Sequence, residues 1–556
     1  MTMDTGEALQ RALALIAEGH AAEASRIASE AIRGDPGNAR AHLVAGVALR
    51  LQGALGEARA ALERAAALDG SAYAPAFELG VVLELTGDAA GALAWHRKAI
   101  ALRPDFAPAR LAAGRLLADA GRGEEALDAV DPVLRASPGD PFALHEKGWI
   151  LHRGGKPALA IPLLEAAVAA RPDAIEWRLD LAKALADRRE DVRAREHYES
   201  AIRAHPPNAQ ALVAYGRFCV SRGDFAGAAQ RFEAALALAP GDPALPIYLA
   251  QAELVQGHWD RGWRWYARRE PRRNFASARR AHGLDDRVPR LAEAAGEELT
   301  LVGEQGLGDV LFHLRYAPAL ALRGARLAFA GDARLIPLLR RAGIFRELRA
   351  GDASTEAGTA HAILTGDLPS IEGMEAVAPS LRIAPDRARE DAWKRRLEAA
   401  GPRPWIGVTW RAGTPSEVLA HGLFKSAPLD RLMAAIAPLG GTVFALQREP
   451  KAGEIDAASA ALGARVHDLS AANGDLEDAL AVLALLDRHV GVSNTNMHLA
   501  ALAGKTADVL VPFPPEWRWG AAGPSPWFPG FRVHRQEPGG DWSAALAALA
   551  ASGQPG

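Results

Sequence analysis

The sequence predicts an α-helical solenoid followed by an α/β region of two lobes. Small residues and prolines recur every 34 residues through the first half of the chain, as in arrays of stacked helical units. From about residue 298, short apolar segments typical of strands alternate with helical segments, which predicts parallel sheets. Of the 556 residues, 49% are apolar and 24% are charged, which is ordinary for a soluble globular protein.

The 34-residue period is visible in four series that stand at fixed offsets from one another. Glycine recurs at Gly19, Gly53, Gly87, Gly121, Gly155, Gly223 and Gly257, with Arg189 in the remaining slot. A second series of small residues runs Gly46, Gly80, Gly114, Gly148, Ala182 and Gly216. Alanine recurs at Ala24, Ala58, Ala92, Ala126, Ala160, Ala194 and Ala228, and proline at Pro36, Pro104, Pro138, Pro172, Pro206 and Pro240, with Gly70 in the open slot.

These positions predict two short amphipathic helices in each unit. The second-series residue and the alanine let the two helices approach closely, the first-series glycine makes the turn between them at a positive φ, and the proline ends the unit. The pattern resembles the tetratricopeptide repeat, with seven units in 1–242. A capping repeat and linker are expected in 243–297. The aromatic segment GHWDRGWRWYARRE there suits a helix that seals the stack, a contact with the next domain, or both.

A stacked array of this kind offers a concave surface on which peptides bind, so a protein partner is expected. Polar inner-face positions include Arg110, His145, Asn208 and Arg217, and a polar residue on a repeat helix is usually just solvated. Cys219 is expected to be buried as a small hydrophobic residue. A single cysteine in the chain excludes an intramolecular disulfide and any site with several cysteine ligands.

The pattern of the second half predicts two Rossmann-like lobes, 298–390 and 391–556. Strands are expected at 298–303, 325–331, 360–366, 404–410, 441–447, 488–493 and 505–511. A helix is expected after the first strand, through about 323, a second helix at 332–342 after the second strand, and a third at 386–401. In such folds, ligands bind at the carboxyl ends of the strands. The cleft between the lobes is therefore the expected site.

The segment GEQGLGDVLFHLRYAP contains a glycine-rich turn from strand to helix. Gly303, Gly306 and Gly308 favour an anion bound by backbone amides at the helix start. Asp309 follows at the cleft, and its alternative role is that of a helix N-cap. A dinucleotide site with Asp332 as the ribose acid is a second alternative, although the G-x-x-G-x-G spacing differs from G-x-G-x-x-G.

Several motifs together support a resemblance to a known family. GEQGLGD, GVTWRAG, FKSAPLDRL, FALQRE, SNTNMHLAALAGKTADVLVPFPPEWRW and SPWFPGFRVHRQ occur in this order. The chain resembles bacterial tetratricopeptide proteins with a C-terminal glycosyltransferase domain related to the heptosyltransferases. The resemblance implies a GT-B fold, in which two Rossmann-like lobes face a cleft, for the α/β region.

The resemblance also implies roles for single residues. Asp309 matches the acid that acts as general base on the acceptor hydroxyl, because the acceptor oxygen loses its proton as it attacks. Gly306, Gly308, Arg411, Lys425, Gln447 and Arg448 are expected to bind the donor. The cations among them suit a departing phosphate, although each alone is also typical of an ordinary surface residue.

The helix start VGVSNTNMHLAALAG is expected to complete the donor site through Ser493, Asn494, Thr495 and His498. Hydroxyl and amide side chains at a helix N-terminus either bind phosphate and ribose or cap the helix. His498 matches the histidine of the family motif D-T-x-x-x-H-L. Ser493 stands where that motif has its aspartate, which suggests a different donor or a weakened site.

The aromatic tail places Trp517, Trp519, Trp527 and Phe528 within twelve residues. These rings suit either stacking on a sugar or base or packing between the lobes and against the repeat cap. Arg518 and Arg535 are ambiguous in the same way. No D-x-D pair follows a strand and no H-x-x-x-H spacing occurs on a helix, so no metal is expected.

The sequence thus predicts a metal-independent glycosyltransferase that needs a nucleotide-sugar donor and no separate cofactor. The expected acceptor is a protein, for example a flagellin or another surface protein, recruited by the repeats. The alternatives are a non-catalytic scaffold with a degenerate transferase-like domain and a dinucleotide-dependent oxidoreductase. A net charge of -3 argues against nucleic acid as partner. The absence of a long apolar run and of a basic N-terminal region predicts a cytoplasmic protein without a membrane span.

Overall fold

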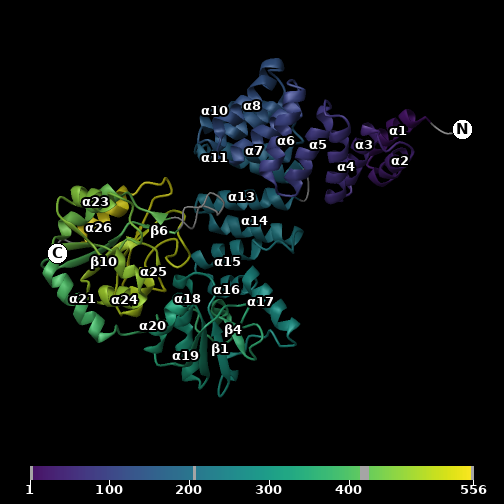
Figure 1. The fold of residues 1–556 in the computed structure, drawn as a ribbon. Helices are drawn as coiled ribbons and strands as arrows, with labels where there is room; N and C mark the ends of the chain where they lie inside the picture. Colours follow the sequence, from purple (N-terminus) through teal and green to yellow (C-terminus); the bar gives the residue numbers. More distant parts are fainter. Residues whose placement is uncertain (1–3, 205–207, 414–424, 553–556) are drawn as a thin grey trace. The chain divides into compact units, whose positions relative to one another are not determined.

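A computed structural model describes residues 4–204, 208–413 and 425–552. The chain divides into two compact units, Met1–Pro206 and Pro207–Gly556, and each is described by itself (Figure 1). The domain limits expected at 242, 297 and 390 stay predictions.

The first unit consists of helices that pack in chain order, each against the next. Their bounds are α1 Thr5–Ala17, α2 Ala21–Gly34, α3 Ala39–Leu51, α4 Leu55–Leu68, α5 Tyr73–Leu85, α6 Ala89–Leu102, α7 Ala107–Asp119, α8 Gly123–Ala136, α9 Pro141–Arg153, α10 Pro157–Ala170, α11 Ile175–Asp187 and α12 Asp191–Ala204. The described helices form a regular series of pairs, as the repeat period predicts.

The first glycine series forms the turn inside each pair. All seven of these glycines have φ between 71° and 85°, and Arg189 in the eighth slot has φ 63°. A left-handed residue is therefore required at this position whatever its type, and glycine adopts it without steric cost.

The second glycine series brings the two helices of a pair together. A Cβ added at Gly46 would lie 2.5 Å from Leu62 of the paired helix, and one at Gly216 would lie 2.5 Å from Phe232. The alanines of the third series are fully buried. The predicted roles of these two series are confirmed for the described repeats; Pro206 of the proline series lies outside the described residues.

The second unit begins with two more helix pairs and an extra helix. These are α13 Ala209–Ser221, α14 Phe225–Leu238, α15 Leu245–Val255, α16 Trp259–Tyr266 and α17 Glu270–Ala281. Gly262 of α16 occupies a tight position, because a Cβ there would lie 2.5 Å from Leu254 of α15. Cys219 is buried on α13, as expected.

The first lobe is a parallel sheet with short helices. Its strands are β1 Glu298–Val302, β2 Arg326–Gly331, β3 Phe345–Ala350 and β4 Ala362–Leu364, and its helices are α18 Leu307–His313, α19 Ala317–Leu322 and α20 Ile336–Arg340. The order is β3-β2-β1-β4, with every pairing parallel. The predicted helix after β1 is interrupted, because Pro318 cannot continue α18 and instead starts α19.

The second lobe contains a six-stranded parallel sheet and a short antiparallel pair. The strands are β5 Trp405–Thr409, β6 Arg411–Ala412, β7 Lys425–Ser426, β8 Thr442–Ala445, β9 Val466–Asp468, β10 Arg488–Val492, β11 Asp508–Val511 and β12 Arg532–Arg535. The helices are α21 Arg387–Ala400, α22 Leu429–Ile436, α23 Glu454–Leu462, α24 Leu476–Leu485, α25 Thr495–Leu502 and α26 Ser543–Ala551. The order β12-β11-β10-β5-β8-β9 is that of a doubly wound sheet.

The prediction of an α/β region with parallel sheets is thus confirmed. Three strands of the two larger sheets, β3, β9 and β12, were not predicted, because each lies at a sheet edge and is short or half-exposed rather than a buried apolar run. The two-residue strands β6 and β7 of the antiparallel pair were not predicted either. All strand pairs of both larger sheets are parallel, so their carboxyl ends share one edge of each sheet.

Candidate functional site

Both parallel sheets reverse their strand order next to their first strand. In the first lobe β2 and β4 flank β1, and in the second lobe β8 and β10 flank β5. Loops that leave such neighbours in opposite directions open a crevice at the carboxyl ends of the strands. The loops after β1, β5, β8 and β10 carry most of the predicted site residues.

The loop after β1 is a tight turn that delivers Asp309. Gln305 has φ 66°, an unfavourable conformation for a residue with a side chain. Gly306 is the N-cap of α18, and because glycine has no side chain it makes no capping hydrogen bond. Asp309 is the third residue of the helix. The N-cap alternative for Asp309 is therefore wrong.

Gly308 permits the first lobe to approach helix α25 of the second. A Cβ at Gly308 would lie 3.2 Å from His498 Cδ2 and 3.6 Å from Thr495 Oγ1. Gly308, Thr495 and His498 were predicted as site residues on opposite lobes, and they lie together. The glycine is explained here by close packing, and any contact with a ligand would be additional.

Asp309 forms an ion pair with Arg518, whose Nη2 donates to Oδ1. The Asp309 side chain is 32% exposed and that of Arg518 is 12% exposed. The guanidinium also lies over the rings of Phe312, at 4.9 Å, and Trp517, at 4.5 Å. These contacts fix the guanidinium beside Asp309, yet its buried Nε has no partner among the described residues.

A second charged pair involves Glu516, two residues before Arg518. Glu516 pairs with Lys425 and accepts a hydrogen bond from Ser493 Oγ at 2.8 Å. Lys425 Nζ also donates to the Ser493 carbonyl oxygen at 3.1 Å. The predicted donor residues Lys425 and Ser493 therefore meet, and a carboxylate stands beside the serine that replaces the family aspartate.

The electrostatics of these groups are coupled. Burial acts to raise the pKa of Glu516, but the charges of Lys425 and Arg518 outweigh burial and hold the pKa below its usual range. Burial acts to lower the pKa of Arg518, but Asp309 and Glu516 raise it. Glu516 and Arg518 are thus ionised, and the cluster alternates positive and negative groups.

His498 is buried and uncharged. Burial, and then the positive charges of Arg518, Arg315 and Lys425, hold the pKa of His498 well below its usual range. Phe312 and Phe528 contact the ring edge-on, with centroids 6.1 and 5.4 Å away. The imidazole therefore packs between α18 and the aromatic tail.

Asn494 caps helix α25. Its side chain accepts a hydrogen bond from the Asn496 amide at 2.9 Å. The capping role that the sequence left open is thus present, and the remaining amides at the start of this helix favour an anion.

Three other predicted donor residues have their contacts outside the Asp309 cluster. Arg411 pairs with Glu454, and Gln447 Oε1 accepts hydrogen bonds from the amides of Trp410 and Arg411 at 3.1 and 3.0 Å. Arg448 is 71% exposed and pairs with its neighbour Glu449. Arg411 and Gln447 join the loops after β5 and β8, Arg448 lies at the surface, and the structure does not bring the three into the Asp309 cluster.

Glu516 is the site residue that sequence reasoning missed. Its signal is a carboxylate one residue before Trp517 and two before Arg518, on the loop that follows β11. The loop could be placed after a strand, but the direction in which its side chains point depends on tertiary packing. Arg518, which the sequence left ambiguous, lies in the centre of the cluster.

The aromatic tail is a core element. Trp517, Trp519, Trp527 and Phe528 are all buried. The ring centroid of Trp527 lies 5.0 Å from that of Trp259 and 5.8 Å from that of Trp263, both on α16. The capping segment and the tail thus pack together, as one of the two alternatives predicted. Arg535 donates to the carbonyl oxygens of Gly520 and Gly523, at 3.0 and 2.8 Å, and fixes this loop.

A buried charged network supports the glycine turn from behind. Arg269, which follows α16, pairs with Glu304 and with Asp367, the latter at 2.8 Å. Tyr266 and the strained Gln305 exchange hydrogen bonds at 3.0 and 3.1 Å. Burial raises the pKa of Tyr266 to about 12. The last repeat therefore fixes the turn that precedes Asp309.

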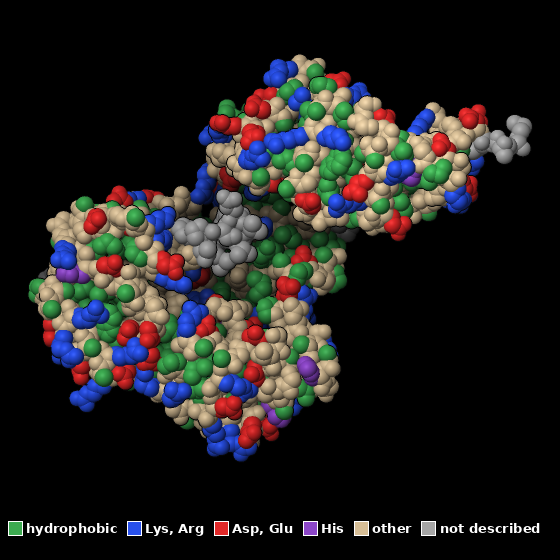
Figure 2. Space-filling view, viewed as in Figure 1, with side chains coloured by type: hydrophobic (Ala, Val, Ile, Leu, Met, Phe, Trp, Pro, Cys, Tyr) green, Lys and Arg blue, Asp and Glu red, His purple; other side chains and the backbone are tan. Residues whose placement is uncertain are grey.

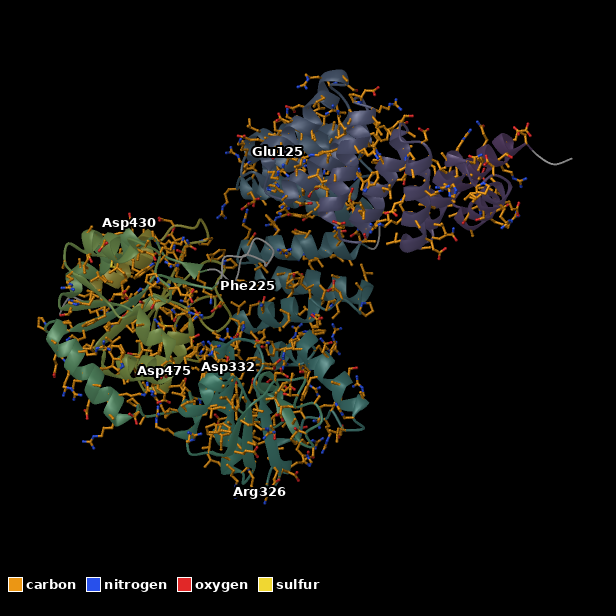
Figure 3. The ribbon with its side chains drawn as sticks, in the orientation of Figure 1. Glu125, Phe225, Arg326, Asp332, Asp430 and Asp475 are labelled. Atoms are coloured by element: carbon orange, nitrogen blue, oxygen red, sulfur yellow. The ribbon has the colours of Figure 1, made fainter. Side chains whose placement is uncertain are left out.

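Asp332, the acid of the dinucleotide alternative, has local partners. Asp332, labelled after β2 in Figure 3, caps the following turn and pairs with Arg334 at 2.6 Å. Within residues 4–204, 208–413 and 425–552, no group of three or more His, Cys, Asp or Glu is arranged to hold a metal ion. No helix of the described chain is long and apolar enough to cross a membrane.

Comparisons with known proteins define the class of the helical part. Models of the tetratricopeptide repeat match 9–243 in six overlapping windows, and a further model of this repeat matches 220–268. The chain therefore carries tetratricopeptide repeats from the first helix pair to α16, and such repeats are binding surfaces for other proteins.

Most of the chain matches a distant homologue. It is similar to Protein FlbA of Caulobacter vibrioides, with 26% identity over 85% of this chain and 82% of that protein. Among solved structures, a tetratricopeptide repeat protein of Parabacteroides merdae is 16% identical with a TM-score of 0.39, covering 44% of this chain and 97% of its own. YrrB, described as a repeat protein with an unusual peptide-binding site, is 20% identical with a TM-score of 0.29, covering 34% and 97%.

Proposed function

We propose that the α/β region is a GT-B glycosyltransferase that moves a sugar from a nucleotide-activated donor to a protein acceptor held by the repeats. The observation that carries the proposal is the cluster of Asp309, Arg518, Glu516, Lys425 and Ser493. It lies where loops from the carboxyl ends of both sheets meet. A flagellin or another surface protein is the kind of acceptor that the resemblance implies.

The proposed chemistry assigns each charge to one part of the transfer. Asp309 accepts the proton of the acceptor hydroxyl, whose oxygen forms a bond to the anomeric carbon of the sugar. The bond from that carbon to the donor phosphate breaks, and the nucleotide leaves with the electron pair. Lys425, together with the amides at the start of α25, stabilises the negative charge that develops on the phosphate. Metal-independent transfer requires cations of this kind.

Glu516 supplies the carboxylate that the motif lacks at Ser493. Glu516 Oε2 accepts a hydrogen bond from the Ser493 hydroxyl at 2.8 Å, so in this proposal the loop after β11 provides the acid. In this proposal the Ser493–Glu516 pair faces the sugar hydroxyls, and a carboxylate is a strong acceptor for them. The internal engagement of Arg411 and Gln447 favours the second candidate, a non-catalytic scaffold.

Donor binding separates these candidates. A panel of nucleotide sugars is titrated into the full chain by calorimetry, with nucleotide release measured in parallel. Lys425→Gln is expected to weaken donor binding about tenfold, the effect of one lost phosphate contact of about 1.4 kcal/mol. Lys451→Gln, which changes an exposed lysine of the same lobe, is the matched control and is expected to leave binding unchanged.

The proposal fails if none of the nucleotide sugars binds. Binding without nucleotide release, in the presence of candidate acceptors, would instead favour the scaffold. Tight binding of a nicotinamide dinucleotide would support the oxidoreductase alternative.

A further inference from the structure

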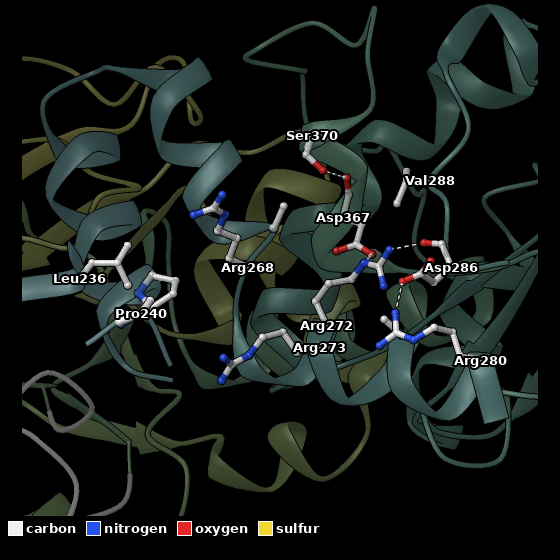
Figure 4. Close-up of a pocket in the computed structure, with 13 residues that line it drawn as sticks. Leu236, Pro240, Arg268, Arg272, Arg273, Arg280, Asp286, Val288, Asp367 and Ser370 are labelled. Atoms are coloured by element: carbon white, nitrogen blue, oxygen red, sulfur yellow. Dashed lines mark hydrogen bonds and ion pairs between the residues drawn. The ribbon is translucent and has the colours of Figure 1, made fainter. Parts of the chain in front are cut away.

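The cavity shown in Figure 4 lies away from the Asp309 cluster, within the second unit. Its volume is about 590 Å³, and α14, the residues leading into α15, α17 and the segment around Asp367 line it. Its charged lining residues are Arg268, Arg272, Arg273, Arg280, Asp286 and Asp367. None of them has a part in the proposed sugar transfer.

Two of the four arginines are neutralised inside the cavity wall. Arg272 Nε lies 2.9 Å from Asp367, and Arg280 Nη1 lies 2.7 Å from Asp286. Figure 4 shows both side chains turned toward these carboxylates. Asp367 is further paired with the buried Arg269. This side of the cavity is therefore charge-balanced, and its Arg269–Asp367–Arg272 part is largely buried.

The other two arginines carry an excess of positive charge. Arg268 and Arg273 are exposed, and in the part of the chain that the structure describes neither has a carboxylate partner. Figure 4 shows both reaching toward the side formed by Leu236 and Pro240. The guanidinium of Arg268 lies over the Trp265 ring, 4.9 Å from its centroid, which restricts its position. Both can donate paired hydrogen bonds to a carboxylate.

The remaining wall is apolar. Leu236, Pro240, Pro246 and Val288 contribute it. A free phosphate ion would use the arginines and leave this wall uncovered, whereas an acidic peptide offers carboxylates together with apolar surface. One side of the cavity, from Leu236 to Arg268, belongs to the part of the chain that matches tetratricopeptide repeats, and solenoids of such repeats bind their partners on extended surfaces.

We propose that this cavity binds an acidic peptide segment of a partner protein. The carboxylates of the peptide pair with Arg268 and Arg273, and an adjoining apolar side chain packs on Pro240 and Pro246. Arg272 holds the floor through the buried Asp367, and Arg280 balances the charge of Asp286. The proposal concerns partner binding and stands whether or not the α/β region transfers a sugar.

The test is a binding measurement on the full chain. The probe is a fluorescein-labelled peptide of alternating Asp, Glu and Leu, read by anisotropy at low and moderate salt. The double variant Arg268→Gln/Arg273→Gln is expected to weaken binding about tenfold, because two ion pairs are lost. Added salt is expected to weaken wild-type binding and to have little effect on the double variant.

Two controls make the outcome decisive. The variant Arg323→Gln/Arg395→Gln removes two exposed arginines outside the cavity lining and is expected to bind like the wild type. A peptide with Asn and Gln in place of Asp and Glu is expected not to bind. Equal affinity of both double variants overturns the proposal, as does binding of the neutral peptide. So does complete displacement of the acidic peptide by equimolar inorganic phosphate, which would make the cavity a phosphate site.

Discussion

The repeat helices and the α/β cluster use charged side chains in opposite ways. In the repeats, Arg50–Glu78, Arg97–Glu125 and Glu165–Arg193 join residues 28 apart in the sequence, on equivalent helices of neighbouring repeats. In the cluster, Arg518 reaches Asp309 across 209 positions. The first pattern repeats along the chain, and the second converges on one place.

Exposure separates two of these three repeat pairs from the cluster, whereas Arg50 and Glu78 are only 20% and 17% exposed. The Arg97–Glu125 side chains are 51% and 49% exposed, and Figure 2 shows charges of both signs mixed over the visible face of the repeats. Exposed pairs of this kind contribute little to stability. The charges of the cluster are largely withdrawn from water, where removing one partner has a large effect. The exposed pairs of the repeats are therefore expected to contribute less to stability than the charges of the Asp309 cluster.

The largest stability effect is expected at Asp508, at the amino end of β11, opposite the cluster. Asp508 is fully buried and accepts from Arg488, Arg532 and His534 at 2.7 to 2.8 Å. Asp508→Asn is expected to lower the free energy of unfolding of the second unit by about 3–5 kcal/mol, measured by urea denaturation. Asp456→Asn, on exposed α23, is the control.

The same carboxylate predicts a pH dependence. Burial acts to raise the pKa of Asp508, but its hydrogen bonds to His534, Arg488 and Arg532 outweigh burial and lower it. A lowered pKa means that its contribution is present above the ordinary aspartate range, about pH 4, and is lost as the pH falls below it. The wild type is expected to lose more stability than Asp508→Asn between pH 5 and 2. An equal loss of stability in the wild type and Asp508→Asn over this pH range would contradict this account.

An intermediate effect is expected where two helices of a repeat meet. Gly46→Ala places a Cβ 2.5 Å from Leu62 and is expected to cost about 1–3 kcal/mol through overpacking. Gly56→Ala, on the adjacent helix with no atom within 4 Å of the new Cβ, is expected to be neutral or slightly stabilising. Thermal unfolding of the two variants checks the difference. Similar melting temperatures would refute the packing role of the second glycine series.

The smallest effect is expected at the surface of the repeats. Arg97→Gln removes a half-exposed pair with Glu125, and the change in the free energy of unfolding is expected to stay below about 1 kcal/mol. Adding salt is expected to abolish even this difference. A loss of several kcal/mol, measured by denaturant titration, would show that the repeat surface depends on its ion pairs after all.

The repeat half could be predicted in detail because its physics is local. The turn position was predicted from glycine spacing, and even Arg189 adopts the left-handed conformation there. The parallel sheets followed from alternating strands and helices. Edge strands such as β12 were missed, since a half-exposed strand lacks the apolar run that marks a buried one.

The candidate site was predictable only in part. The turn that carries Asp309 and the helix start after Ser493 were placed by strand ends. The partnership of Ser493 with Glu516 was not, because it depends on how a loop folds back over 23 residues. Arg411 was expected at the site and instead pairs with Glu454, since nothing in the sequence indicates which acid reaches a given arginine.

The most direct test of the central claim is nucleotide release by the full chain with its nucleotide sugar and acceptor, comparing Asp309→Asn with Asp332→Asn. Both variants remove an acid of the first lobe that pairs with an arginine. The account predicts that Asp309→Asn lowers turnover about 10²- to 10⁴-fold through loss of the general base, while Asp332→Asn keeps near wild-type turnover. Equal turnover of the two variants would contradict it.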